Sequence, residues 1–341
     1  TVSRAAPETY GTGDDDMIGY LLRRLVYGVS VLLGVNFLTF VLFFAVNTPD
    51  DMARLNLGGR YVTAEAVADW KTAHGYDQPL FYNVAEKGTG KITKTLFWSK
   101  SVPLLTGDLG MTDAGRSINE DVRERAPASL ALAVPTFVLG VAVMLVFSLL
   151  LVWVRRTGWE TAGVVTSIGI MSVSSLFYII LGLWPCAKSL RCVPVSDFAD
   201  GIGMVHFLVL PVAIALFSRL GGDALLYRAL FLEEIGKDYV RTARAKGAGE
   251  LQVLFGHVLR NAMLPILTST VAAIPMLFMG SLIMENFFGI PGLGAYTIDA
   301  INAQDFSVVR SMVFLGTAAY VAGLILTDFA YAAADPRIRL Q

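Results

Sequence analysis

Long apolar segments alternate with short charged ones along most of this chain. An α-helix rises about 1.5 Å per residue, so roughly 20 consecutive apolar residues cross the hydrocarbon core of a bilayer. Six segments reach that length or nearly reach it. The pattern therefore predicts an all-α, polytopic membrane protein with six transmembrane helices. The six segments are residues 25–46, 126–154, 161–187, 201–218, 261–284 and 311–327.

The composition agrees with that class. Of the 341 residues, 55% are hydrophobic and only 16% are charged, whereas soluble domains carry about 25% charged residues. The net charge is −1, so the chain as a whole offers no electrostatic basis for binding nucleic acid. Residues 1–16 are polar and end in three aspartates, which predicts a disordered leader before a retained first helix at 17–46.

Lysine and arginine gather on one side of the predicted spans, which by the positive-inside rule is the cytoplasmic side. Residues 47–125 carry ten basic residues, but long segments are translocated largely regardless of charge. Both termini are therefore predicted to be cytoplasmic, and residues 47–125 and 185–200 to face outward. The basic residues of the cytoplasmic side are Arg23, Arg24, Arg155, Arg156, Arg219, Arg228, Lys237, Arg241, Arg244, Lys246, Arg260, Arg337 and Arg339.

Cys186 and Cys192, the two cysteines of the chain, both fall in the second outward segment. On an oxidising face two thiols this close in sequence can form a small disulfide. Two unpaired thiols at a helix end are the equally weighted alternative.

Signatures of catalysis and of cofactor binding are missing from the sequence. The nearest approach to a phosphate-binding loop has Ala85 in place of its first glycine and Ile92 in place of its Ser or Thr. The three histidines are far apart, and none belongs to a metal-binding motif. We therefore expect no enzyme activity, no cofactor and no metal. Intramembrane charge is also sparse, which disfavours a proton-driven carrier. Glu285, Arg310 and Asp328 all fall near span ends.

A charged helical hairpin is predicted over residues 223–262, between the fourth and fifth spans. Apolar residues recur at helical spacing before Gly247 and Gly249, which are typical of a helix end. Basic residues alternate with small ones over 241–247, a pattern that favours a flat surface for close protein contact. The alternative is a surface helix attracted to anionic membrane lipid.

Two segments of this hairpin, Arg241-Thr-Ala-Arg-Ala-Lys-Gly247 and His257-Val-Leu-Arg-Asn-Ala262, resemble the EAA loop of ABC importer permeases. The resemblance is closest to the dipeptide/oligopeptide type, the binding-protein-dependent transport inner-membrane components, and it covers residues 21–339. Three further segments agree with it, namely Gly107-Asp-Leu-Gly110, Glu285-Asn-Phe-Phe-Gly-Ile-Pro-Gly-Leu-Gly294 and Asp335-Pro-Arg337.

The resemblance implies a type I ABC importer-like fold and a permease core at 126–341. It also implies three kinds of partner: a second homologous permease, two cytoplasmic ATP-binding subunits and an extracytoplasmic binding protein. The hairpin would couple the permease to an ATP-binding subunit. The implied coupling residues are Tyr239, Arg241, Thr242, Ala243, Arg244, Lys246, Gly247 and His257.

The chain departs from the family pattern at two positions. Arg241 stands where the motif usually has Glu, and Arg260 where it has Pro. Asp238 or Glu234 is the candidate replacement for the missing acidic residue. Cargo stays open among dipeptides, oligopeptides, nickel and sugars. A self-sufficient secondary carrier or channel, and a membrane scaffold that recruits a cytosolic protein, are the alternative functions.

Overall fold

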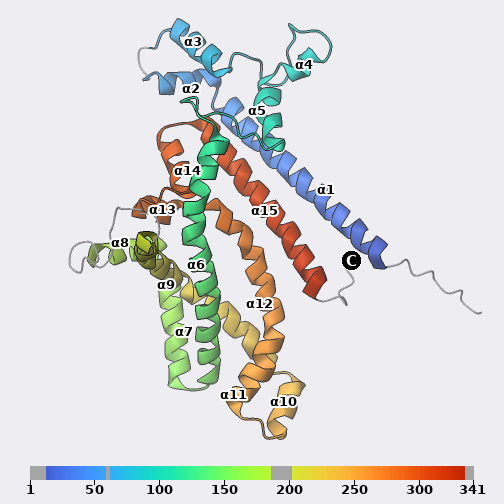
Figure 1. Ribbon diagram of the computed structural model, residues 1–341, viewed down its shortest axis with the longest axis vertical. Coiled ribbons are helices and arrows are strands. Elements are labelled where there is room, and N and C mark those ends of the chain that lie inside the picture. The colour runs from blue at the N-terminus through green and yellow to red at the C-terminus, as the bar shows by residue number, and fades with distance from the viewer. Residues whose placement is uncertain (1–12, 59–61, 186–201, 335–341) are drawn as a thin grey trace, which may run out of the picture.

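The computed structural model describes residues 13–58, 62–185 and 202–334 of the chain (Figure 1). Within those residues the regular structure is helical, apart from one isolated β-bridge between Met111 and Ser117. This confirms the predicted all-α class. The Cys186–Cys192 pair and the Asp335–Arg337 segment lie outside the described residues.

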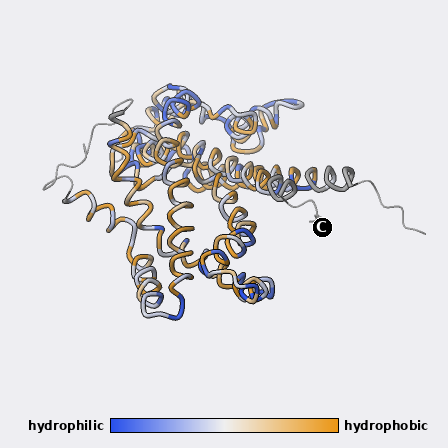
Figure 2. The backbone as a smooth tube through the Cα atoms, turned by 60° about the horizontal axis from the view of Figure 1, so that its bottom comes forward, coloured by the Kyte–Doolittle hydropathy of each residue, from blue (hydrophilic) through white to orange (hydrophobic). Residues whose placement is uncertain are grey.

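Four helices are long and apolar enough to cross a membrane, or five spans result if a bent helix pair counts as one. Figure 2 shows hydrophobic colour along these helices and hydrophilic colour gathered toward their ends. The predicted number of six spans and the cytoplasmic termini stay predictions. The four helices are α1 (Gly13–Phe40) with its continuation η1 (Val41–Val46), α6 (Ile118–Trp153), α9 (Ile202–Ile235) and α15 (Phe306–Ala334).

The third predicted span is not one straight helix. It consists of α7 (Gly158–Met171) and α8 (Ser175–Pro185), which meet at an angle of 92°. Serine side chains bond to the backbone at the break: the Ser172 hydroxyl donates to the carbonyl of Ile168 (2.7 Å), and the Ser174 hydroxyl accepts from the Leu176 N–H. Such side-chain bonds compete with the helical backbone pattern.

The fifth predicted span is interrupted as well. Its residues form α12 (Leu259–Ala273), the 3₁₀-helix η4 (Ile274–Met279) and α13 (Leu282–Phe288). Pro275, the second residue of η4, has no N–H to continue the helical ladder, and Gly280 follows η4 with φ +69°. The apolar run is therefore divided into three helical pieces instead of continuing as one helix.

Two predicted boundaries need correction. α1 begins at Gly13, so residues 13–16 are helical and not part of a disordered leader, and acidic residues at a helix start interact favourably with the helix dipole. α9 runs on to Ile235, so residues 223–235, predicted as the first arm of the hairpin, are the last part of a long membrane helix.

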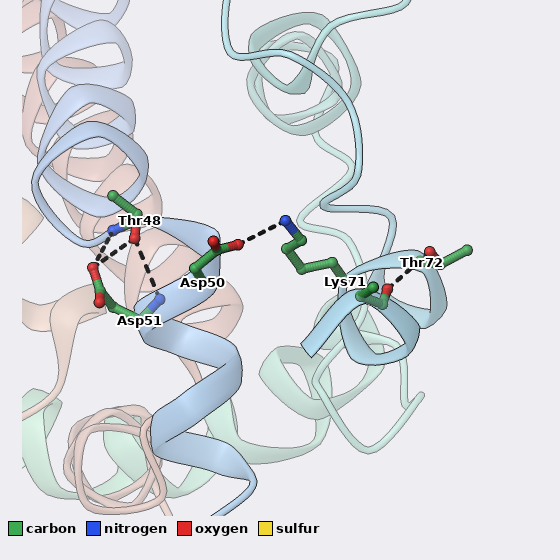
Figure 3. Close-up of polar contacts among 6 residues, drawn as sticks. Thr48, Asp50, Asp51, Lys71 and Thr72 are labelled. Atoms are coloured by element: carbon green, nitrogen blue, oxygen red, sulfur yellow. Dashed lines mark hydrogen bonds and ion pairs between the residues drawn. The ribbon is translucent and has the colours of Figure 1, made fainter. Parts of the chain in front are cut away.

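Short helices cap the end of the molecule where α1 ends and α6 begins (top of Figure 1). Rings of Phe40, Phe44 and Tyr76 pack together there and join the cap to α1. Polar contacts fix the helix starts: Thr48 and Asp51 form a capping box, and Lys71 pairs with Asp50 (Figure 3). The cap consists of α2 (Pro49–Asn56), α3 (Ala64–His74), α4 (Gly90–Thr93) and α5 (Leu96–Leu105).

Asp113 makes the stability of this end sensitive to pH. Burial and the neighbouring Asp305 raise the pKa of Asp113 to about 6, although His74 and Lys100 act against the shift. A carboxyl with a raised pKa contributes stability that is full below its unfolded pKa, 3.8, and is lost as pH rises through the folded value near 6.

We therefore expect the wild-type chain to lose stability relative to Asp113→Asn as pH rises from about 4 to about 6. The difference in thermal unfolding midpoint between the two purified proteins, measured across that window in detergent, checks this. A difference that stays constant with pH would contradict it.

Candidate functional site

The hairpin lies at the end of the molecule opposite the cap (bottom of Figure 1). It consists of α10 (Asp238–Ala245), a glycine turn, α11 (Glu250–Val253) and the π-helical turn η3 (Leu254–Val258), which leads into α12. The Gly247 N–H donates to Arg244 O (2.9 Å) and the Ala248 N–H to Ala243 O (3.2 Å). With φ +85° at Gly247, this is a Schellman turn, which requires a residue in the left-handed region.

One face of α10 is buried. Val240 is fully buried and Ala243 is 8% exposed, and both pack with Ile235, Val253 and Leu254 in one apolar cluster. That cluster also contains residues of α6, so the hairpin is seated on the long helices. Ala243, predicted as a coupling residue, is thus largely covered by this cluster.

Ion pairs tie the hairpin to its neighbours. Arg244 binds Glu250 with two hydrogen bonds (2.8 and 3.1 Å), and Arg155, just beyond the end of α6, approaches the same carboxylate at 3.7 Å. Arg241 contacts only the exposed Asp238 within the described residues, at 3.4 Å. Glu250 thus links α10, α11 and the end of α6, whereas the Arg241 pair is exposed to solvent and contributes little.

The junction between α9 and α10 is held by Glu234, which is 8% exposed and accepts hydrogen bonds from Lys237 and from the Tyr239 hydroxyl. Burial, together with the bond to Glu234, raises the pKa of Tyr239 to about 12, so its hydroxyl keeps its proton and stays a donor. The hydrogen bond to Glu234 also raises the pKa of Lys237. Of the two candidate replacements for the motif Glu, Asp238 contacts Arg241 and Glu234 instead fixes the helix junction.

A groove of about 400 Å³ opens on this hairpin. It brings together six of the eight predicted coupling residues, while Arg241 and Arg244 lie outside it. Ala248 and Gln252 also line it, and the sequence analysis missed both. The lining residues are Tyr239, Thr242, Ala243, Lys246, Gly247, Ala248, Gln252 and His257.

A second hollow, the cleft, lies between α6, α9, α12 and α13. It consists of a cavity of about 520 Å³ and a smaller one of about 120 Å³ that share Thr136, Phe137, Arg219 and Ala273. Arg219 carries charge into a largely apolar lining, and Asp223 lines the smaller cavity beside it. Sequence analysis missed this pair because the fourth span was predicted to end at Ser218.

Glu285 is fully buried, and its carboxylate lies next to Gly280 and Ser281, which line the cleft. Its carboxylate accepts three backbone N–H groups, from Ser281 (2.9 Å), Gly294 (2.7 Å) and Ala295 (3.2 Å). The last two belong to the first turn of α14 (Leu293–Asn302), where a carboxylate also interacts favourably with the helix dipole.

Glycine is required on both sides of that carboxylate. A Cβ on Gly292 would lie 2.3 Å from Glu285 Oε2, and one on Gly280 would lie 2.6 Å from Oε1. The Ser129 hydroxyl of α6 accepts from the Leu293 N–H (2.7 Å). Glu285 therefore fixes α13 and α14 to each other at one end of the cleft, and Ser129 fixes α14 to α6.

Within residues 13–58, 62–185 and 202–334, no group of three or more His, Cys, Asp or Glu side chains is placed to hold a metal ion.

Comparison with known proteins identifies the family. Residues 125–340 match the model of the binding-protein-dependent transport system inner membrane component, and residues 17–100 match the N-terminal model of the same components. The chain belongs to this family. It is therefore a multi-pass inner-membrane component of an ABC transport system, as the resemblance of the hairpin sequence implied.

Individual relatives match this chain along nearly their whole length. A putative peptide transport system permease protein of Brucella abortus (strain 2308) is 31% identical over 336 residues, covering 95% of this chain and 99% of the relative. The dipeptide transport system permease protein DppB of Bacillus subtilis (strain 168) is 28% identical over 329 residues, with coverage of 95% and 99%. The oligopeptide transport system permease protein AppB of the same organism is 26% identical over 330 residues, with coverage of 94% and 99%.

Proposed function

We propose that this chain is the membrane-spanning permease subunit of an ATP-driven importer of di- or oligopeptides, delivered by an extracytoplasmic binding protein. The full-length similarity to permeases named for peptide, dipeptide and oligopeptide transport supports the cargo class. The observation that carries the coupling role is the hairpin, whose open groove is attached to the membrane helices through a buried face.

In this proposal the groove receives an element of a cytoplasmic ATP-binding subunit, and two such subunits act on two homologous permeases. The chain needs no nucleotide site of its own, because its partners hydrolyse the ATP. Closure of the ATP-binding subunits pushes on α10, and the contacts of Val240, Glu234 and Arg244 transmit the push to α9 and α6. Both helices line the cleft, so the same movement changes which side of the membrane it opens to.

One observation favours the alternative of a self-sufficient carrier. Arg219 and Asp223 form an ion pair well inside α9, and charges within a membrane span are common in ion-coupled carriers. That alternative requires transport by the purified chain alone.

Gentle solubilisation from native membranes and identification of the co-purifying proteins test the proposal. We expect a second permease and ATP-binding subunits in fixed stoichiometry, and ATP-dependent uptake after reconstitution with the binding protein. A chain that purifies alone or as a homo-oligomer and transports without ATP would favour the carrier instead.

A further inference from the structure

Arg219 is a charged residue placed where charge is costly. It lies near the middle of the 34-residue helix α9, so roughly 25 Å of helix separates it from either end. Arg228, nine residues further along, already pairs with Glu160 near the start of α7, at the end of α7 that lies toward the hairpin. Ionisable residues inside a membrane span are rare and mark substrate pathways by default.

The surroundings of Arg219 point to the cleft and not to the lipid. Its side chain lines both cavities of the cleft, and it keeps 57% of its surface exposed. Neighbouring hydroxyl groups of Thr136 and Ser218 line the same space. These groups suit the amide groups of a peptide main chain, and the apolar remainder of the lining accommodates varied side chains.

The ion pair leaves half of the guanidinium available. Nε and Nη2 of Arg219 both contact a single oxygen, Oδ2 of Asp223, at 3.2 and 3.1 Å. Among the described residues, the other edge, formed by Nη1 and Nη2, has no further protein acceptor. An arginine edge of this kind binds a carboxylate with two parallel hydrogen bonds.

We propose that Arg219 binds a carboxylate of the cargo inside the cleft, foremost the C-terminal carboxylate of a peptide, while Asp223 positions the guanidinium. This inference rests on the proposed peptide-import function. A free C-terminus is common to all unmodified peptides, so its recognition selects peptides as a class without selecting their sequence. The pair also keeps the empty cleft electrically neutral, which limits the cost of the charge.

The test uses the complete importer reconstituted in vesicles with internal ATP, since the two permeases share the cargo path in the proposal. Uptake of oligo-alanines of two to five residues is compared as free acids and as C-terminal amides, each with excess binding protein. Because the binding protein is the same throughout, a change in the free-acid to amide ratio reports on the permease alone.

Arg219→Gln is expected to lower uptake of the free acids roughly tenfold and to leave uptake of the amides within about twofold of the wild-type rate. Asp223→Asn, which keeps the arginine, is expected to retain a preference for the free acid. Arg54→Gln, the same change on an exposed residue of α2, serves as the matched control and is expected to change neither rate.

An amidated peptide with one internal glutamate distinguishes the two sources of a carboxylate. If its uptake also depends on Arg219, the site accepts a side-chain carboxylate as well, and if not, the site is specific for the terminus. Equal loss for acids and amides would reduce the ion pair to a structural role and overturn the proposal, as would unchanged uptake of both. Failure of the wild-type importer to take up any of these peptides would instead refute the proposed function, and the site with it.

Discussion

Gly247→Asp is expected to abolish ATP-dependent uptake while the chain stays folded in the membrane. The glycine has φ +85°, and a side chain in that region costs roughly 1–2 kcal/mol. No atom lies within 4 Å of the added Cβ, so the change strains the turn without displacing neighbours. The new carboxylate lies in the groove next to Lys246, so it reverses the charge of the surface that the proposal offers to the ATP-binding subunit. Uptake by the reconstituted importer, with unfolding temperature and monodispersity as folding checks, measures this.

Two variants separate charge from strain. Gly247→Asn has the same shape, tolerates the left-handed region and is neutral, so we expect it to retain most of the uptake. Gly88→Asp makes the same substitution at another exposed glycine with positive φ (+64°) and open space around it. Gly88 lies two residues before α4, which is at the end of the molecule opposite the hairpin (Figure 1). Normal uptake by Gly247→Asp would remove the coupling role from the hairpin.

The turn at Gly247 was predictable because its chemistry is local. A glycine after an amphipathic helix, followed by a second helical pattern, specifies a Schellman turn from a few residues. The place of Ala243 on the apolar face of the helix was also predictable, because it follows Ile235 and Tyr239 at helical spacing. The neighbours that cover it were not predictable, since they come from α9, α11 and η3.

The length of α9 was hidden for a different reason. Hydropathy ends the fourth span at Ser218, because Arg219 and the pair Gly221-Gly222 follow. In the structure α9 continues through these residues, and Gly221 serves helix packing, because a Cβ there would lie 2.2 Å from Ser167 O of α7. In the sequence, a glycine that allows a neighbouring helix to pack closely cannot be told from a glycine that ends a helix. The charged pair of the cleft was therefore assigned to the cytoplasm.

The breaks in the third and fifth spans were only partly visible. Pro275 and Gly280 signal the end of α12 within the sequence itself. At the 92° bend after Met171, the side chains of Ser172 and Ser174 bond to the backbone. Serines also make such bonds in straight membrane helices, so the sequence does not indicate the bend. Local polar residues thus permit the bend, and packing against α9 and α13 selects it.

Glu285→Gln is expected to destabilise the α13–α14 unit by roughly 3 kcal/mol or more, the loss of one to two hydrogen bonds to a charged group. All three partners of Glu285 are donors: Ser281 N–H on one oxygen, Gly294 and Ala295 N–H on the other. A glutamine places its NH₂ group against at least one of them in either orientation, so two donors then face each other in a site closed to water. The thermal unfolding midpoint and the rate of proteolysis in the 280–294 segment measure the loss, with the exposed Glu124→Gln on α6 as control.

The same variant reports on the cleft, because Gly280 and Ser281 form part of its wall. Loosening α13 changes the shape of that wall without touching the hairpin groove. We therefore expect Glu285→Gln to lower uptake while ATP-binding subunits still co-purify, whereas Gly247→Asp weakens that association. If the stability of Glu285→Gln is unchanged, the Glu285 carboxylate does not fix α13 to α14. The position of α13 would then depend on the apolar cluster that contains Met284 and Phe288.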